Sequence, residues 1–207
     1  MRKPSVNIFL EESKFEIPSW NQVYLFLLKL AKAIQNDRFE ANLIVGVSRG
    51  GWIPARILSD LLENSKLANI KAEFYVDTGK TMCKPIITQS VSVSVRNKKI
   101  LLVDDVADTG ESLKLVYSQL RKNGASKIKI ATIYYKPWSI TIPDYYAKET
   151  SLWIVFPWEI KETVRKTIEE YSQKRKIVEE IKERLISIGL DMDLVERFVK
   201  EVIEHER

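Results

Sequence analysis

The sequence predicts an α/β fold with a doubly wound, mainly parallel sheet, followed by an all-helical C-terminal appendix. Two observations predict it. Short apolar runs alternate with stretches of helical periodicity as far as Tyr134, and after Glu159 only helical stripes remain. Strands that alternate with helices form right-handed crossovers, which cover both faces of a parallel sheet.

Apolar spacing predicts the individual elements of the α/β part. Residues recurring at helical spacing predict helices over 20–34, 53–62 and 113–120, and Ser19 precedes the first of them as a capping residue. Short apolar or alternating runs predict strands over 42–47, 70–76, 100–103 and 128–134. The segment 78–90 contains Gly and Pro without a regular period, which predicts a loop.

The appendix contains two amphipathic stripes. The first is formed by Ile177, Ile181, Leu185 and Ile188, and the second by Leu194, Phe198 and Val202. Between them, Gly189 is suited to end a helix and Asp191 to cap the next one. The sequence leaves open whether these helices serve oligomerisation, cover an active site or add stability.

The composition is that of a folded protein, with 45% hydrophobic and 29% charged residues. There is no apolar run of about 18 residues that would cross a bilayer. The N-terminus lacks the apolar core of a signal peptide, so we expect a cytoplasmic protein without a membrane partner. The single cysteine, Cys83, excludes an internal disulfide. Abundant Lys, Glu and Ile indicate a thermophilic source.

The net charge of +5 is unevenly distributed. Residues 159–207 contain 11 Lys/Arg and 13 Asp/Glu, whereas residues 1–158 contain 22 and 15. The basic surplus therefore belongs to the α/β part, where it fits a polyphosphate substrate. Nucleic acid is not expected as a partner, because the sequence has no run of five basic residues.

The strongest chemical signal is the segment Ile100 to Ser112, in which a buried strand ends in two adjacent carboxylates and a Gly-containing turn opens a helix. Asp104 and Asp105 are acceptors suited to ribose hydroxyls and to a hard cation. The hydroxyls of Thr109 and Ser112 and the N–H groups of the turn suit a phosphate monoester. The alternative is a plain pair of strand-end aspartates, with Asp108 only capping the helix.

A second polar turn, Ser48-Arg49-Gly50-Gly51, follows the strand predicted over 42–47. Two glycines let the backbone approach an anion, and Arg49 adds a fork of donors. Replacing Gly51 with valine is therefore expected to abolish turnover by blocking this approach, while leaving the fold largely intact. Taken alone, the turn is explained equally well as an ordinary connection between a strand and a helix. Both turns follow strands of a parallel sheet, at whose carboxyl edge ligands bind.

These two segments, in this order, resemble the signatures of type I phosphoribosyltransferases. Ile100 to Ser112 is similar to their site for 5-phosphoribosyl-1-pyrophosphate (PRPP), and Ser48 to Gly51 to their pyrophosphate loop. The resemblance implies the type I phosphoribosyltransferase fold and places the nucleotide contacts on Ser48, Arg49, Gly50, Gly51, Asp104, Asp105, Ala107, Asp108, Thr109, Gly110, Glu111 and Ser112.

The resemblance also implies roles for individual residues. Asp108 would handle the proton of purine N7, Arg49 would hold the pyrophosphate, and Asp105 would assist Mg²⁺ as the cofactor. A strained cis peptide is implied at Ser48–Arg49. The segment 78–90 would close over the site, with Lys80 or Lys84 contributing.

The downstream segments Tyr135 to Trp138 and Trp153 to Glu159 are similar to xanthine-guanine and related archaeal purine phosphoribosyltransferases. By this resemblance Lys136 addresses the 6-substituent of the purine, Trp153 stacks on its ring, and the backbone of Ile154 and Val155 reads its edge. The alternatives are a solvated lysine at a strand end and a tryptophan in the ordinary core.

The expected domains are a phosphoribosyltransferase domain over 1–158, with its purine-binding segment at 136–158, and a helical domain over 159–207. The appendix looks like that of the crenarchaeal adenine phosphoribosyltransferases, which slightly favours adenine and AMP. The lysine donor instead fits a 6-oxopurine, which is the alternative.

The resemblance implies that a purine base and PRPP give a nucleoside 5′-monophosphate and pyrophosphate, and that the enzyme is a homodimer. A PRPP-sensing regulator that acts through nucleic acid is the alternative from another class, disfavoured by the acidic appendix. A pyrimidine-salvage enzyme is disfavoured by the segment from Trp153 to Glu159.

Overall fold

The computed structural model describes residues 15–75, 84–173 and 178–205, which form two compact units. One unit, here called the sheet unit, comprises residues 23–151, and the other, the helical unit, comprises residues 15–22 and 152–205. The segment 152–158 thus groups with the C-terminal helices. The predicted functional domains 1–158 and 159–207 divide the chain at a different point, and that division stays a prediction.

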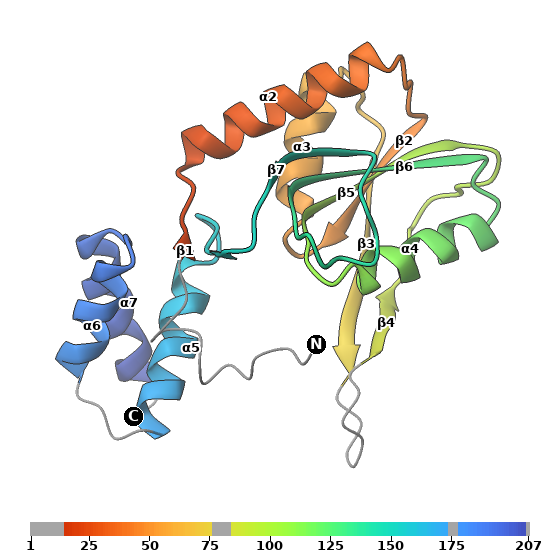
Figure 1. Ribbon diagram of the computed structural model, residues 1–207. Coiled ribbons are helices and arrows are strands. Elements are labelled where there is room, and N and C mark those ends of the chain that lie inside the picture. Colours follow the sequence, from red (N-terminus) through yellow and green to blue (C-terminus); the bar gives the residue numbers. More distant parts are fainter. Residues whose placement is uncertain (1–14, 76–83, 174–177, 206–207) are drawn as a thin grey trace. The chain divides into compact units, whose positions relative to one another are not determined.

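The sheet unit is built on six strands in the order β4-β3-β2-β5-β6-β7 (Figure 1). Every neighbouring pair is parallel except β3 and β4. This arrangement confirms the predicted mainly parallel sheet. The strands are β2 (Leu43–Ser48), β3 (Leu67–Tyr75), β4 (Lys84–Gln89), β5 (Lys99–Ala107), β6 (Lys127–Tyr135) and β7 (Tyr145–Glu149).

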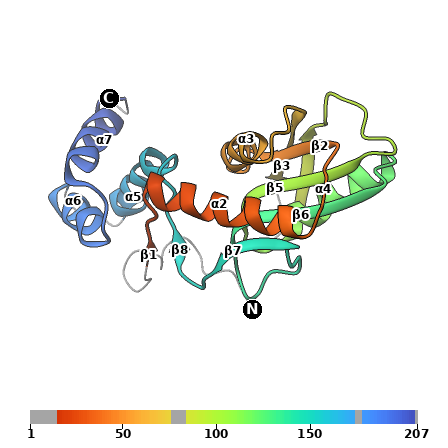
Figure 2. The same ribbon diagram turned by 90° about the horizontal axis from the view of Figure 1, so that it is seen from above.

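Helices cover both faces of this sheet, as the alternating pattern predicts. Helices α2 (Trp20–Asn36) and α3 (Trp52–Leu61) lie on one face, and α4 (Glu111–Lys122) lies on the other (Figure 1; Figure 2). Ser19 caps α2, because its Oγ accepts the N–H of Gln22 at 3.2 Å. The core under α4 is apolar throughout and includes Val45, Leu102, Ile130, Leu113, Val116 and Leu120.

The prediction of a loop over 78–90 was wrong for its second part. Residues Lys84–Gln89 form β4, which pairs antiparallel with β3 at the edge of the sheet. An edge strand tolerates a proline such as Pro85. Because no residue of β4 is fully buried, the alternation of apolar and polar residues along it is weak. The residues 78–83, including Lys80, lie outside the described part of the chain. Strand β7 was not predicted at all.

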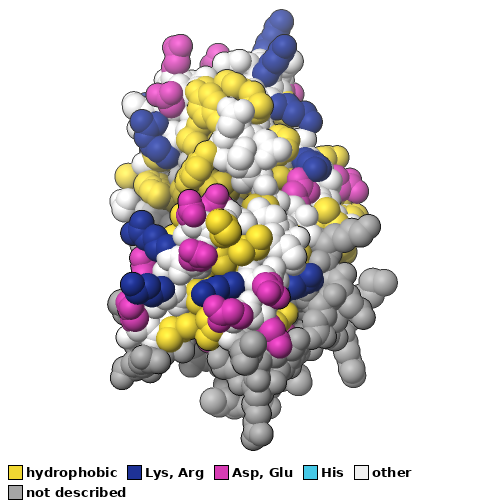
Figure 3. Space-filling view, turned by 90° about the vertical axis from the view of Figure 1, so that its left-hand side faces the viewer, with side chains coloured by type: hydrophobic (Ala, Val, Ile, Leu, Met, Phe, Trp, Pro, Cys, Tyr) yellow, Lys and Arg dark blue, Asp and Glu magenta, His cyan; other side chains and the backbone are white. Residues whose placement is uncertain are grey.

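The helical unit has its own apolar core. Helices α5 (Ile160–Gln173), α6 (Val178–Ser187) and α7 (Met192–His205) pack against one another around a core that also contains Val155. Beside this core, β8 (Trp153–Ile154) pairs in parallel with β1 (Phe15–Glu16). Acidic and basic side chains are interspersed on the face that carries α6 and α7 (Figure 3). Among the described residues, none of the helices combines the length and apolarity needed to span a membrane.

The junction between α6 and α7 follows the predicted punctuation. Gly189 has a φ of 106°, and Asp191 Oδ1 accepts the N–H of Leu194 at 3.1 Å as a helix cap. The predicted stripe on α7 is displaced, however. Val195 and Val199 are fully buried together with Val202, whereas Leu194 is only half-buried. Small valines occupy the core because three helices converge there. The sequence prediction instead chose Leu194, because it is the larger apolar residue.

The displaced stripe gives a stability prediction. Val199→Ala should lower the free energy of unfolding by roughly 1.5–3 kcal/mol, since it removes two buried methyl groups and leaves a cavity. Leu194→Ala should cost less, although it removes a larger side chain. Urea titrations followed by circular dichroism would measure both. If Leu194→Ala proved the more damaging substitution, the register of α7 described above would be wrong.

Candidate active site

The carboxyl ends of three neighbouring parallel strands meet at one edge of the sheet. Strand β5 lies between β2 and β6 and is parallel to both. The ends of these strands are therefore adjacent, at Ser48 for β2, Ala107 for β5 and Tyr135 for β6. The segments predicted to bind PRPP, and Lys136 directly after β6, are thus brought to the same edge.

The turn from Ser48 to Gly51 connects β2 directly to α3. The peptide bond between Ser48 and Arg49 is cis, as the resemblance implied. Ser48 Oγ accepts a hydrogen bond from Asn69 Nδ2 of β3 at 3.2 Å, and the Arg49 side chain is exposed. The turn is consequently fixed at its start by the neighbouring strand.

Both glycines of this turn lie against β5. A Cβ atom on Gly50 would stand 1.8 Å from Asp105 Oδ2. A Cβ atom on Gly51 would stand 2.6 Å from the carbonyl oxygen of Val103 and 2.7 Å from that of Val47. This packing argues against the expectation that Gly51→Val leaves the fold largely intact, because the added atoms would collide with backbone of β2 and β5. Gly50 instead faces a side chain.

The paired carboxylates lie in the carboxyl-terminal half of β5. Asp104 Oδ1 accepts the N–H of Asp105 at 3.0 Å, and Asp105 Oδ1 accepts the N–H of Val106 at 2.8 Å. Leu102 and Ala107 both belong to the core under α4, although they are an odd number of residues apart. The strand thus changes face at the two aspartates. Asp105 is buried and Asp104 half-buried.

This donor set fits a magnesium ion that is held mainly by its substrate. Mg²⁺ commonly takes one or two carboxylates and completes its octahedron with phosphate oxygens and water. Asp104 and Asp105 offer two such carboxylates. Within the part of the chain that the structure describes, three or more metal-ligating side chains do not gather anywhere, so a cage made wholly of protein is not present there.

The predicted phosphate turn opens α4, as expected. Gly110 precedes the helix with a φ of 78°, a conformation that glycine adopts without strain. Glycine has no side chain with which to cap the first turn, where the helix dipole favours an anion. Thr109 Oγ1 accepts the N–H of Glu111 at 3.4 Å, while Ser112 is half-buried in the first turn.

A second backbone segment holds this turn in place. The N–H of Ile140 donates to the carbonyl of Thr109 at 3.0 Å, and Thr141 Oγ1 donates to the carbonyl of Gly110 at 2.9 Å. A Cβ atom on Gly110 would be 2.5 Å from Ser139 Oγ. The segment after β6 therefore supports the phosphate turn and admits only glycine at its centre.

Lys136 is only 5% exposed, which excludes the alternative of a solvated surface lysine. Its N–H donates to the carbonyl of Ala107 at 3.1 Å, and its Nζ lies 5.5 Å from the centre of the Trp138 ring. The Trp138 Nε1–H in turn donates to Asp108 Oδ1 at 3.2 Å. The structure thus links Asp108 and Lys136 through a tryptophan to which sequence reasoning gave no role.

The remaining residues predicted to contact the base belong to the helical unit. Trp153 is 43% exposed, which excludes its alternative as an ordinary core residue. Ile154 and Val155 are buried, and the N–H of Val155 donates to the carbonyl of Glu16 at 3.0 Å. A contact of Val155 with a purine would therefore use its carbonyl group. That Trp153 and Lys136 address the same base stays a prediction.

Sequence reasoning missed a polar group beside the Ser48 turn. Lys71 of β3 pairs in register with Ser48, and its Nζ lies 2.8 Å from Glu73 Oε1. Hydrogen bonds from Lys71 and Thr88 lower the pKa of Glu73, and the charge of Arg49 contributes to the same shift. The alternation of apolar and polar residues along β3 marks Lys71 as a polar residue. Only the pairing of β3 with β2 places it beside Ser48. Lys84, at the start of β4, is exposed.

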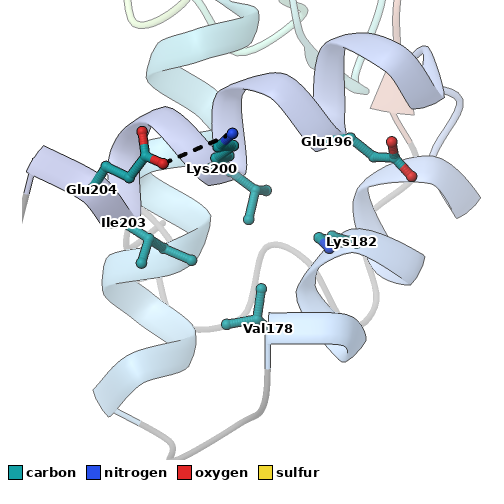
Figure 4. Close-up of a pocket in the computed structure, with 7 residues that line it drawn as sticks. Val178, Lys182, Glu196, Lys200, Ile203 and Glu204 are labelled. Carbon is teal, nitrogen blue, oxygen red and sulfur yellow. Dashed lines mark ion pairs between the residues drawn. The ribbon is translucent and has the colours of Figure 1, made fainter.

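A separate hollow of about 250 Å³ belongs to the helical unit and lies between α6 and α7 (Figure 4). Its charged lining is balanced, because Lys182 of α6 and Lys200 of α7 are matched by Glu196 and Glu204, both of α7. Lys200 lies 4.0 Å from Glu204 on the same helix. None of its lining residues is among those predicted for the site. A balanced lining of this kind favours neither an anion nor a cation.

Comparison with known proteins agrees with the geometry of the sheet unit. Residues 19–164 match the family described as the phosphoribosyl transferase domain. The chain belongs to this family. It is thus a phosphoribosyltransferase, an enzyme of the glycosyltransferase type, and members of the family generally use Mg²⁺ with PRPP.

Two relatives illustrate the likeness of this phosphoribosyltransferase to known proteins. A xanthine-guanine phosphoribosyltransferase from Cereibacter sphaeroides is 29% identical over 147 residues, which cover 69% of this chain and 85% of the relative. The crystal structure of a purine phosphoribosyltransferase from Pyrococcus horikoshii is 39% identical, with a TM-score of 0.64, and the match covers 70% of this chain and 93% of that one.

A third match extends further along the chain. A hypothetical protein from Neisseria gonorrhoeae with bound ppGpp aligns with 92% of this chain and 98% of its own, with a TM-score of 0.67. At 19% identity it shows the fold alone. Because the match covers 92% of this chain, it extends beyond the sheet unit into residues of the helical unit.

The two glycines of the Ser48 turn give a matched pair of substitutions. Gly50→Ala should keep the fold but displace the Asp105 carboxylate, which would then no longer accept the hydrogen bond from the N–H of Val106. We expect this loss to reduce kcat/KM for PRPP roughly tenfold or more. Gly51→Ala should instead destabilise the fold, since its Cβ meets backbone. Thermal melts and PRPP titrations separate the two effects. A Gly51→Ala protein that melts like the wild type would contradict the packing.

Proposed function

We propose that the protein is a purine phosphoribosyltransferase that prefers 6-oxopurines and converts a purine base and PRPP to a nucleoside 5′-monophosphate and pyrophosphate. One observation carries the proposal. The turn from Ser48 to Gly51 contacts Asp105, and the segment that follows β6 both supports Gly110 and carries the buried Lys136. Donors and acceptors for pyrophosphate, ribose, phosphate and base thus adjoin one edge of the sheet.

Each part of PRPP has a matching group at this edge. The guanidinium of Arg49 and the N–H groups of Gly50 and Gly51 bind the pyrophosphate, which needs donors at close range. Asp104 and Asp105 accept hydrogen bonds from the ribose hydroxyls. The 5′-phosphate binds at the amino end of α4, where Thr109 and Ser112 add hydroxyl donors to the helix N–H groups.

The base is addressed by Lys136 and by the segment from Trp153 to Val155. A buried ammonium group is a donor without an acceptor function, so it suits the 6-oxygen of guanine, xanthine or hypoxanthine and repels the 6-amino group of adenine. The relatives named xanthine-guanine phosphoribosyltransferases support the same choice at 29% identity and below. The preference for adenine rested on the helical appendix and is given up in favour of its alternative.

The reaction forms one bond and breaks another. Purine N9 attacks C1 of the ribose, the C1–oxygen bond to pyrophosphate breaks, and the proton on N7 passes to the carboxylate of Asp108. Positioning of the two substrates and stabilisation of the leaving anion supply most of the rate enhancement. When bound at Asp105, Mg²⁺ would neutralise part of the pyrophosphate charge.

A PRPP-sensing regulator remains the alternative from another class. It is disfavoured because acidic and basic side chains are interspersed among the described residues on the face that carries α6 and α7 (Figure 3). Homodimer formation and an archaeal, thermophilic source stay predictions.

A base panel with PRPP and Mg²⁺ tests the proposal through pyrophosphate release. Guanine, xanthine or hypoxanthine should give a higher kcat/KM than adenine. Lys136→Met should reduce kcat/KM for the preferred 6-oxopurine roughly 10- to 150-fold, because a hydrogen bond from a charged donor is lost. Adenine should be affected much less.

Lys122→Met on the exposed surface of α4 is the control and should behave as the wild type. A strong preference for adenine would overturn the 6-oxopurine assignment, and inactivity with every purine would overturn the purine assignment itself.

A further inference from the structure

Trp138 is a large aromatic side chain that is 51% exposed and yet makes two specific contacts. Its Nε1–H donates to Asp108 Oδ1 at 3.2 Å. Its ring faces the Nζ of Lys136, which lies 5.5 Å from the ring centre, within the range of a cation–π interaction. One side chain therefore contacts both residues of the sheet unit that the proposed function assigns to the base.

The backbone holds Trp138 in this position from both sides. The N–H of Lys136 donates to the carbonyl of Ala107 at 3.1 Å, and the N–H of Ile140 donates to that of Thr109 at 3.0 Å. The N–H of Ser139 closes the turn on the carbonyl of Lys136 at 2.9 Å. The indole thus sits in a turn whose two ends are bonded to the residues on either side of Asp108.

Packing gives no sufficient reason for a tryptophan here. A side chain with half of its surface in solvent adds little to the stability of a core, and exposed positions usually tolerate substitution within about 0.5 kcal/mol. The neighbouring Ile140 and Ile142 are still more exposed, at 60% and 70%. The two polar contacts of the indole are therefore the features that distinguish Trp138 from the rest of its turn.

We propose that Trp138 is a positioning residue of the base site, an inference that rests on the proposed function. By engaging Oδ1 of Asp108, the indole fixes the rotation of the carboxylate and presents Oδ2 to N7 of the purine. Its ring face holds the Lys136 ammonium group toward the 6-oxygen. The side chain thereby couples recognition of the 6-substituent to transfer of the N7 proton.

Two variants separate the contacts. Trp138→Phe keeps a ring for Lys136 but has no N–H for Asp108, whereas Trp138→Leu removes both. Trp138→Phe should lower kcat roughly tenfold, as expected for a lost hydrogen bond to a charged group, and leave KM for PRPP unchanged. Trp138→Leu should in addition raise KM for the 6-oxopurine several-fold. Ile142→Ala, in the same segment, is the control and should match the wild type.

A spectroscopic arm tests the hydrogen bond without activity. In ¹⁵N-labelled protein the indole N–H signal of Trp138 is identified by its loss in Trp138→Phe. It should shift in Asp108→Asn, where the charged acceptor is replaced by a neutral one, and stay in place in Ile142→Ala. Melting temperatures of all variants show whether each is folded.

The outcomes distinguish this inference from the proposed function. A wild-type protein that is inactive with every purine would refute the proposed function, and the base-site role of Trp138 with it. Wild-type activity that Trp138→Phe leaves unchanged, or a Trp138 signal that Asp108→Asn does not move, would overturn the positioning role alone.

Discussion

The site depends on one close approach, in which the Gly50 backbone lies against the carboxylate of Asp105. No Cβ atom fits between them, and at Gly51 none fits between the turn and the carbonyls of Val47 and Val103. This contact requires β2 and β5 to be neighbours in a parallel pair, so that β2 ends beside the two aspartates of β5. It also requires α3 to begin immediately after the turn, and Gly46 permits this by letting Ala55 approach β2 closely.

The Ser48–Gly51 turn and the turn before α4 are held in place by different interactions. The Ser48 turn packs directly against β5, which is possible because Gly50 and Gly51 have no side chains, and Asn69 holds its start by a hydrogen bond to Ser48. The turn before α4 is fixed by hydrogen bonds from Ile140 and Thr141 instead. The segment that follows β6 therefore has two tasks, because it supports the phosphate turn through its backbone and carries Lys136 and Trp138 as side chains.

The sequence predicted those features that depend on local chemistry. A buried run that ends in two aspartates and a glycine has few structural solutions, and β5, the turn after it and α4 were placed correctly from it. Features set by long-range contacts escaped prediction. Strand β4 is defined by its partner β3 and not by its own period, and Val199 is buried because three helices converge on it.

The same distinction explains the side chains that were missed. Lys71 owes its place to its register with Ser48 across two strands, and no local motif marks it. Trp138 reaches Asp108 across 30 positions of sequence, because the ends of β5 and β6 are adjacent. Reading both from sequence would require the strand order to be known first.

The residues assigned to PRPP and those assigned to the base are distributed differently over the two units. All residues assigned to PRPP lie in the sheet unit, where short contacts between backbone segments fix their geometry. The residues assigned to the base are divided, with Lys136 in the sheet unit and Trp153 in the helical unit. The chemistry of PRPP is common to a whole family, so a rigid and local site serves it well. Choice among bases differs between relatives, and a side chain such as Lys136, which lies outside the contact between Gly50 and Asp105, can be exchanged without disturbing that contact.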